Sequence, residues 1–129
     1  MERLMTALLE LTLPMALVNK YGGWGSRQIV DDFEYYARFI LNEYKDEVKY
    51  WLTINEQSIV VNYIDRKNKL TNEQKFDPKF RYQANHYMNL AHARAAIAVH
   101  EIVPGGQCGA ALDMAPYYPH TCDPKDILA

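Results

Sequence analysis

Apolar residues along the chain alternate between short strand-like runs and longer stretches with helical spacing. Met5–Leu13 and Val48–Asn55 are short and rich in apolar, β-branched or aromatic side chains, as buried strands are. Between them, behind Ser26, whose side chain suits a helix N-cap, apolar residues recur every three or four positions. These positions are Ile29, Val30, Phe33, Tyr36, Ala37, Ile40, Leu41 and Tyr44. The pattern predicts an amphipathic helix with one buried face.

A second helix is predicted after a polar segment at about residues 65–75, which is long for a loop and therefore of functional interest. It begins at Asp77-Pro78, with Asp as N-cap and Pro at the first helical position, and stops before Pro104-Gly105-Gly106. Its apolar face consists of Phe80, Ala84, Tyr87, Met88, Ala91, Ala95 and Ala98. Gln107–Met114 then has the character of a short strand, and Asp123-Pro124 starts another helix.

The order strand, helix, strand, helix, strand, start of helix predicts parallel strands with right-handed crossovers. Two architectures fit, a doubly wound sheet and an arc of a (β/α)8 barrel. The chain contains neither GxGxxG nor GxxxxGK[ST], which removes the strongest signals of a nucleotide-binding fold. In a barrel arc the three strands would end near Leu13, Asn55 and Met114, with both long helices on one face.

Composition narrows the expected partners. The net charge of −2 gives no reason to expect nucleic acid or an anionic membrane surface, and no segment has the ~20 uninterrupted apolar residues of a membrane span. The apolar N-terminal stretch is similar to a signal peptide, but Glu2, Glu10 and Pro14 interrupt it, so we favour a buried strand. Cys108 and Cys122 belong to no CxxC or Cys/His cluster, and we interpret them as reduced thiols in a cytoplasmic protein.

In both architectures, function resides in the loops after the carboxyl ends of the strands. Glu56 follows the strand Val48–Asn55 directly and therefore stands at a functional position. The alternative is an ordinary acid that starts a loop or helix. His86, His92 and His100 lie on or near one predicted helix without convergent ligands, so no metal site is expected.

Aromatic residues supply further candidates for ligand binding. Trp24 and Trp51 could stack on the apolar face of a bound ligand. For Trp51, burial against the helices is the favoured alternative, whereas Trp24 follows two glycines in a loop and has the better chance of approaching a ligand. Tyr117 and Tyr118 follow the third strand on the predicted active face, where binding and packing both stay open.

Six segments in chain order resemble motifs of glycoside hydrolase family 1. WLTINEQ, at Trp51–Gln57, resembles the signature T-[FIL]-N-E-[PQIV] of that family. The other similar segments are Leu13–Leu17 with Lys20–Trp24 (LPxxL…xYGGW), Phe33–Ala37 (FxxYA), Val48–Trp51 (VKYW), Ala91–Ala93 (AHA) and Tyr118–Asp126 (YPxTxxPxD). Within the family, NEQ and YQANHYMNLAHA look most like bacterial phospho-β-glucosidases.

The resemblance implies a partial (β/α)8 barrel, with residues 1–129 as one partial catalytic domain that covers about the third to fifth βα units. Glu56 matches the general acid/base, and Asn55 matches the residue that hydrogen-bonds the sugar 2-hydroxyl. Trp24 and Tyr117 are added as candidates for substrate binding. The expected substrates are β-glucosides or 6-phospho-β-glucosides, and no cofactor is implied.

The sequence also departs from the family pattern. The ENG-like motif that carries the nucleophile has no counterpart, and Glu10 stands where the family usually has histidine. A retaining glycosidase needs both carboxyl groups ~5–5.5 Å apart, so this chain alone is expected to be inactive. The alternative is a non-catalytic remnant that binds sugar weakly or only associates with other chains. The open edges of an incomplete barrel would favour such self-association.

Overall fold

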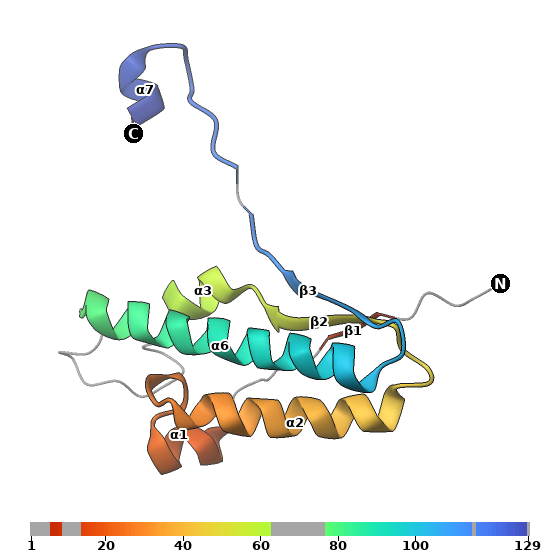
Figure 1. The fold of residues 1–129 in the computed structure, drawn as a ribbon. Helices are drawn as coiled ribbons and strands as arrows, with labels where there is room; N and C mark the ends of the chain where they lie inside the picture. Colours follow the sequence, from red (N-terminus) through yellow and green to blue (C-terminus); the bar gives the residue numbers. More distant parts are fainter. Residues whose placement is uncertain (1–5, 9–13, 63–76, 115, 129) are drawn as a thin grey trace.

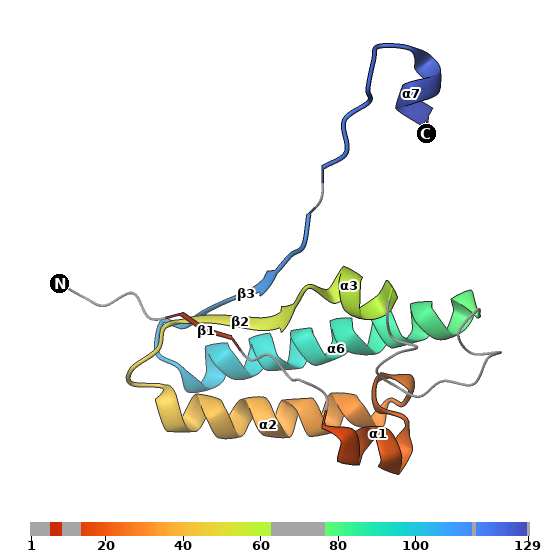
Figure 2. The same cartoon turned by 180° about the vertical axis from the view of Figure 1, so that it is seen from behind.

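The computed structural model describes residues 6–8, 14–62, 77–114 and 116–128. Strands β1 (Thr6–Leu8), β2 (Tyr50–Asn55) and β3 (Gln107–Ala111) form a parallel sheet in the order β1-β2-β3. The long helices α2 (Gln28–Tyr44) and α6 (Pro78–Ile102) lie side by side on the same side of this sheet (Figures 1 and 2). Sequential parallel strands with both helices on one side form a barrel arc and not a doubly wound sheet, which confirms the predicted fold class.

Four short elements complete the described chain: α1 (Met15–Tyr21), the 3-10 turn η1 (Gly23–Gly25), α3 (Gln57–Asn62) and α7 (Pro124–Leu128). Helix α1 was not predicted from the sequence, because its seven residues are too few to show a helical period. The helix ends at Gly22, where φ is 88° and the backbone N–H donates to the carbonyls of Leu17 and Val18. Only glycine adopts this left-handed conformation without steric cost, which explains the first glycine of the turn.

The predicted element ends agree in part with the structure. Asp77 caps α6 as expected, because its Oδ1 accepts a hydrogen bond of 2.9 Å from the N–H of Lys79. Ser26 Oγ accepts from the N–H of Gln28 at 3.3 Å, although the residue before α2 is Arg27. β3 ends at Ala111 and not near Met114. The predicted strand end at Leu13 and the polar segment 65–75 lie outside the described residues.

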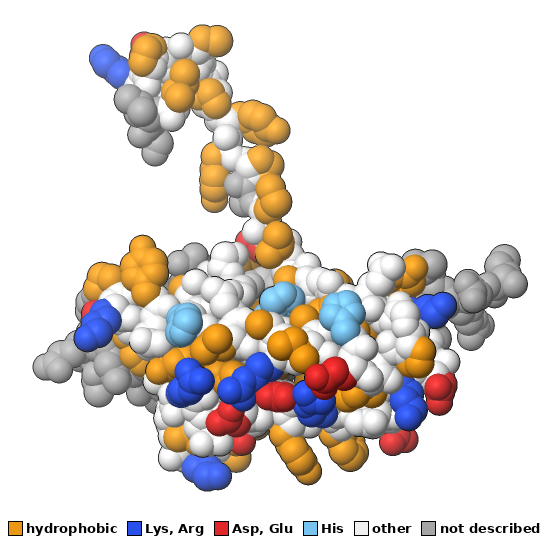
Figure 3. All heavy atoms as spheres, in the orientation of Figure 1, with side chains coloured by type: hydrophobic (Ala, Val, Ile, Leu, Met, Phe, Trp, Pro, Cys, Tyr) orange, Lys and Arg blue, Asp and Glu red, His pale blue; other side chains and the backbone are white. Residues whose placement is uncertain are grey.

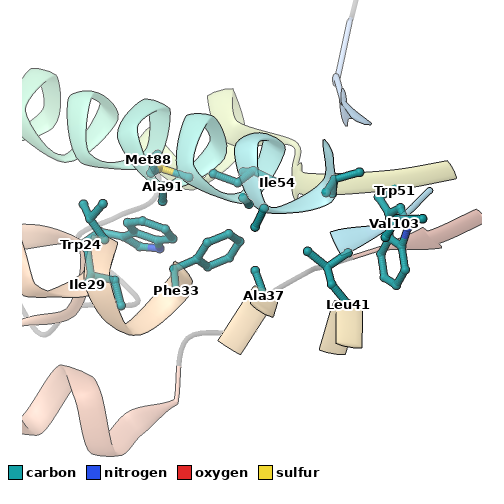
Figure 4. Packing of buried hydrophobic residues seen from close by; sticks show 14 of the residues in the cluster. Trp24, Ile29, Phe33, Ala37, Leu41, Trp51, Ile54, Met88, Ala91 and Val103 are labelled. Atoms are coloured by element: carbon teal, nitrogen blue, oxygen red, sulfur yellow. The ribbon is translucent and has the colours of Figure 1, made fainter. Parts of the chain in front are cut away.

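The hydrophobic core fills the space between the two long helices and the sheet (Figure 4). Trp51 of β2 is 1% exposed, and its indole N–H donates to the carbonyl of Val48 at 3.1 Å, which confirms that it packs against the helices. Alanines with no exposed surface on either helix allow α2 and α6 to approach closely. These alanines are Ala37, Ala84, Ala91, Ala95 and Ala98.

A network of ion pairs joins α2 to α6 on the outer surface (Figure 3). Arg94 contacts Asp31 at 2.5 Å and Glu34 at 3.2 Å, while Arg38 contacts Glu34 and Glu101, both at 2.9 Å. These groups are partly exposed, and isolated pairs of this kind contribute little to stability. The shared carboxylate of Glu34 links them into one network that fixes the register of the two helices.

Beyond Ala111 the chain leaves the sheet and runs out to α7, which stands apart from the rest (Figure 1). The exposed fractions of Leu112, Met114, Tyr117 and Tyr118 lie between 74% and 92%. Among the described residues, no helix is both long and apolar enough to cross a membrane.

We expect Ala95→Leu to lower the free energy of unfolding by about 1–3 kcal/mol, because extra methylene groups have no space between packed helices. Ala93→Leu, on the exposed side of the same helix, is the control and should change it by less than about 0.5 kcal/mol. Urea titration of helical circular dichroism measures both. Equal effects of the two substitutions would contradict the packing described for α6.

Candidate active site

An irregularity near the end of β2 determines which way Asn55 faces. Leu52 is registered with Gly109 and Asn55 with Ala111, so Thr53 and Ile54 oppose one residue of β3. This is a β-bulge, which breaks the alternation of side chains. Thr53 and Ile54 are both buried, and Ile54 belongs to the core cluster on the helix side. Asn55 therefore falls on the opposite side of the sheet, with Leu52, and not among the helices.

Glu56 follows the bulge in an unusual backbone conformation. Its φ is +47°, and it is the one non-glycine residue with positive φ in the part of the chain that the structure describes. Its N–H donates to the carbonyl of Ala111 at 2.8 Å. Its own carbonyl accepts from Ile59 at 2.9 Å and from Val60 at 3.1 Å, which starts α3. Such a conformation costs roughly 1–3 kcal/mol and persists only when surrounding contacts fix it, as happens at functional sites.

The residues on both sides of Asn55 and Glu56 are tied to helix α6. Thr53, which has no exposed surface, shares a hydrogen bond through Oγ1 with Nδ1 of His92, and the same hydroxyl donates to the carbonyl of Gly109 at 3.3 Å. Gln57 Nε2 donates to Oδ1 of Asn85 at 2.6 Å and to Oδ1 of Asn89 at 2.8 Å. The strand end is thus held to both β3 and α6.

The remaining predicted site residues are not brought beside Glu56. Trp24 is 4% exposed and lies in the helical layer, with its ring centroid 6.2 Å from that of Phe33 (Figure 4). Burial of its large apolar surface in the core explains this placement. Tyr117 is exposed on the segment after β3. A sugar-binding role for these two residues stays a prediction, and Glu10 lies outside the described residues.

No group of three or more His, Cys, Asp or Glu side chains that could hold a metal ion occurs within the described residues. Of the three histidines on α6, His92 is used structurally, through Thr53. Sequence reasoning did not find the contacts of Gln57, because Asn85 and Asn89 look like solvated positions on a helix surface. Their spacing of four residues, which puts both on one face, is the signal that was available.

The site therefore presents a carboxyl group and a neighbouring amide at the carboxyl end of a parallel barrel strand, in a strained and well-braced turn. The family model described as Glycosyl hydrolase family 1 matches residues 3–129. The chain belongs to glycosyl hydrolase family 1. Active sites of (β/α)8 barrels lie at the carboxyl ends of their strands, where Asn55 and Glu56 stand.

Individual family 1 proteins show the same relationship. The chain is 39% identical over 117 residues to the aryl-phospho-beta-D-glucosidase BglC of Bacillus subtilis, an alignment that covers 91% of this chain and 24% of BglC. It is 35% identical over 126 residues to the 6-phospho-beta-glucosidase AscB of Escherichia coli, covering 97% and 27% of the two chains.

Solved family 1 structures match the fold. A family 1 β-glucosidase from Thermotoga maritima in complex with isofagomine lactam has a TM-score of 0.72 at 30% identity, covering 96% of this chain and 28% of the other. The rice β-glucosidase Os3BGlu6 has a TM-score of 0.71 at 31% identity, covering 92% and 28%. The chain thus spans about a quarter of the length of the family members it matches.

Strain at residue 56 can be measured with two substitutions that both remove the carboxyl group. We expect Glu56→Gly to be more stable than Glu56→Ala by about 1 kcal/mol, because only alanine keeps the Cβ that opposes the left-handed conformation. Urea titration of both variants under identical conditions gives the difference. If Glu56→Ala were the more stable of the two, residue 56 would not be held at positive φ.

Proposed function

We propose that this chain carries the general acid/base, Glu56, and the 2-hydroxyl-binding residue, Asn55, of a retaining β-glycosidase that acts on β-glucosides and 6-phospho-β-glucosides. The observation that carries this proposal is the position of Glu56, in a strained turn directly after a parallel barrel strand. The relatives named above as aryl-phospho-β-D-glucosidase and 6-phospho-β-glucosidase support the substrate class.

Each of the two residues has a distinct chemical task in this proposal. Glu56 in its protonated form donates to the leaving glycosidic oxygen, and in its ionised form it later activates water. Asn55 lies on the same strand end, and its amide donates to the sugar 2-hydroxyl, a contact that strengthens in the oxocarbenium-like transition state. The bulge in β2 supports this role because it removes Asn55 from the core side of the sheet.

The second carboxylate of the retaining mechanism has to come from elsewhere in a family 1 barrel. The nucleophile motif has no counterpart in this sequence, and the chain spans about a quarter of its relatives. By itself the chain is inactive in this proposal, and hydrolysis needs a complete barrel. The second candidate function, a non-catalytic chain that binds sugar weakly or only associates with other chains, is favoured by the same missing motif.

A cytoplasmic location belongs to the same proposal. Cys108 and Cys122 are both unpaired, as thiols in a reducing compartment are. Burial raises the pKa of the Cys108 thiol, which disfavours the reactive thiolate form.

The role of Glu56 is tested by leaving-group dependence. In a full-length family 1 enzyme, replacing the glutamate that matches Glu56 by glutamine should slow hydrolysis of substrates with poor leaving groups by roughly 10²–10⁴-fold. Activated aryl glucosides need no proton and should be slowed much less. Steady-state kinetics on both substrate types, including 6-phosphates, measures this.

An equal loss on both substrate types would exclude Glu56 as the acid. The chain itself should show no turnover of either type. Turnover by the chain that disappears in Glu56→Gln would instead require a second carboxylate within it, with Glu10 as the first candidate.

We expect the chain to self-associate in solution. In the described sheet β1 and β3 each pair with β2 alone, so both present an open edge, and the segment after β3 exposes large apolar side chains. Sedimentation velocity should detect oligomers whose proportion rises with concentration. Ala110→Lys, which places a charge on the β3 edge, should shift them toward monomer, whereas Ala93→Lys on α6 should not. A compact monomer at all concentrations would contradict the expectation.

A further inference from the structure

The strain at Glu56 needs an external restraint, because glutamate has no intrinsic preference for positive φ. One restraint is the hydrogen bond from its N–H to Ala111 of β3. The other acts through α3, which begins at the next residue and in which the N–H groups of Ile59 and Val60 donate to the Glu56 carbonyl. Helix α3 has six residues and is too short to be stable alone, so its own position must be fixed by another element.

Gln57 provides that fixation. Its side-chain amide has two hydrogens, and the two short contacts to Asn85 Oδ1 and Asn89 Oδ1 use both of them. The two acceptors lie one helical turn apart on the same face of α6, which is the longest helix of the structure described here. A donor group held at two points cannot rotate, so the first residue of α3 is fixed in both position and orientation.

We propose that Gln57, together with Asn85 and Asn89, is a positioning residue that holds Glu56 in its left-handed conformation and thereby presents its carboxyl group at the strand end. The inference rests on the proposed function of Glu56 for its catalytic meaning, but the restraint itself is a property of the backbone. A general acid must keep hydrogen-bond distance to its oxygen, so a relaxed backbone at this position would move the carboxyl away from its target.

The test is hydrogen–deuterium exchange of the Glu56 amide in the full chain, read at residue resolution by mass spectrometry. Gln57→Leu removes the donor at similar size and should accelerate exchange at residue 56 roughly tenfold, the effect of about one lost hydrogen bond. The double variant Asn85→Ala/Asn89→Ala removes both acceptors without changing α3, and alanine is a better helix former than asparagine. It should accelerate exchange at residue 56 to the same extent, and it keeps the test available if Gln57→Leu does not fold. Ser58→Ala, at an exposed position of α3, is the matched control and should leave the rate unchanged.

Gln57 could also stabilise the contact between α3 and α6 without acting on the conformation of Glu56. Repeating Gln57→Leu in the Glu56→Gly chain separates this alternative from the positioning role. Glycine adopts positive φ without strain, so Gln57→Leu should there accelerate exchange at residue 56 only about twofold. An equal acceleration in both backgrounds, or exchange in Gln57→Leu as slow as in Ser58→Ala, would overturn the positioning role. These outcomes are independent of the leaving-group experiment, which alone decides whether Glu56 is the acid.

Discussion

The structure depends first on the packing of α2 against α6, in which Ala37 on α2 and Ala91, Ala95 and Ala98 on α6 are all fully buried members of one core cluster. Two helices that meet this closely act as one layer, and Phe33, Leu41 and Trp51 then fill the remaining space against the sheet. The sheet, as far as the described residues go, has three strands, and its outer strands β1 and β3 each pair with β2 alone. Helix α6 is therefore the reference against which the end of β2 is placed.

The site depends on that reference through polar contacts and not through apolar burial. Thr53 lies on the α6 side of β2 and shares its hydroxyl with His92, and Gln57 reaches the same helix one turn and two turns earlier, at Asn89 and Asn85. Apolar contacts have no directional preference, whereas hydrogen bonds fix orientation. A turn with a non-glycine residue at positive φ needs such directional restraint, and Asn55 and Glu56 lie between the two ties.

The parts of the fold that depend on local composition were predictable. Asp77 followed by Pro78 determines where α6 begins, and the period of apolar residues in α2 determines its buried face, so both agree with the sequence. The position of Glu56 directly after a strand could also be predicted from the sequence. The bulge at Thr53–Ile54 was not, because it depends on how β3 pairs with β2 and leaves no local signal. Trp24 shows the same limit, since two preceding glycines indicate a loop but not which way its side chain turns.

The unpredicted features share a physical cause that also bears on function. The bulge, the left-handed residue and the tie through Gln57 all arise from contacts between elements distant in sequence, and all of them lie at the strand end that carries Glu56. A complete retaining site requires a second carboxylate at a set distance from the first, which demands a fixed geometry on both sides. The position of one carboxyl group can therefore be fixed by β2, β3, α3 and α6, whereas a pair of carboxyl groups at a set distance needs the closed barrel. This division explains how a chain with about a quarter of the length of its relatives can fix the position of one carboxyl group at a strand end.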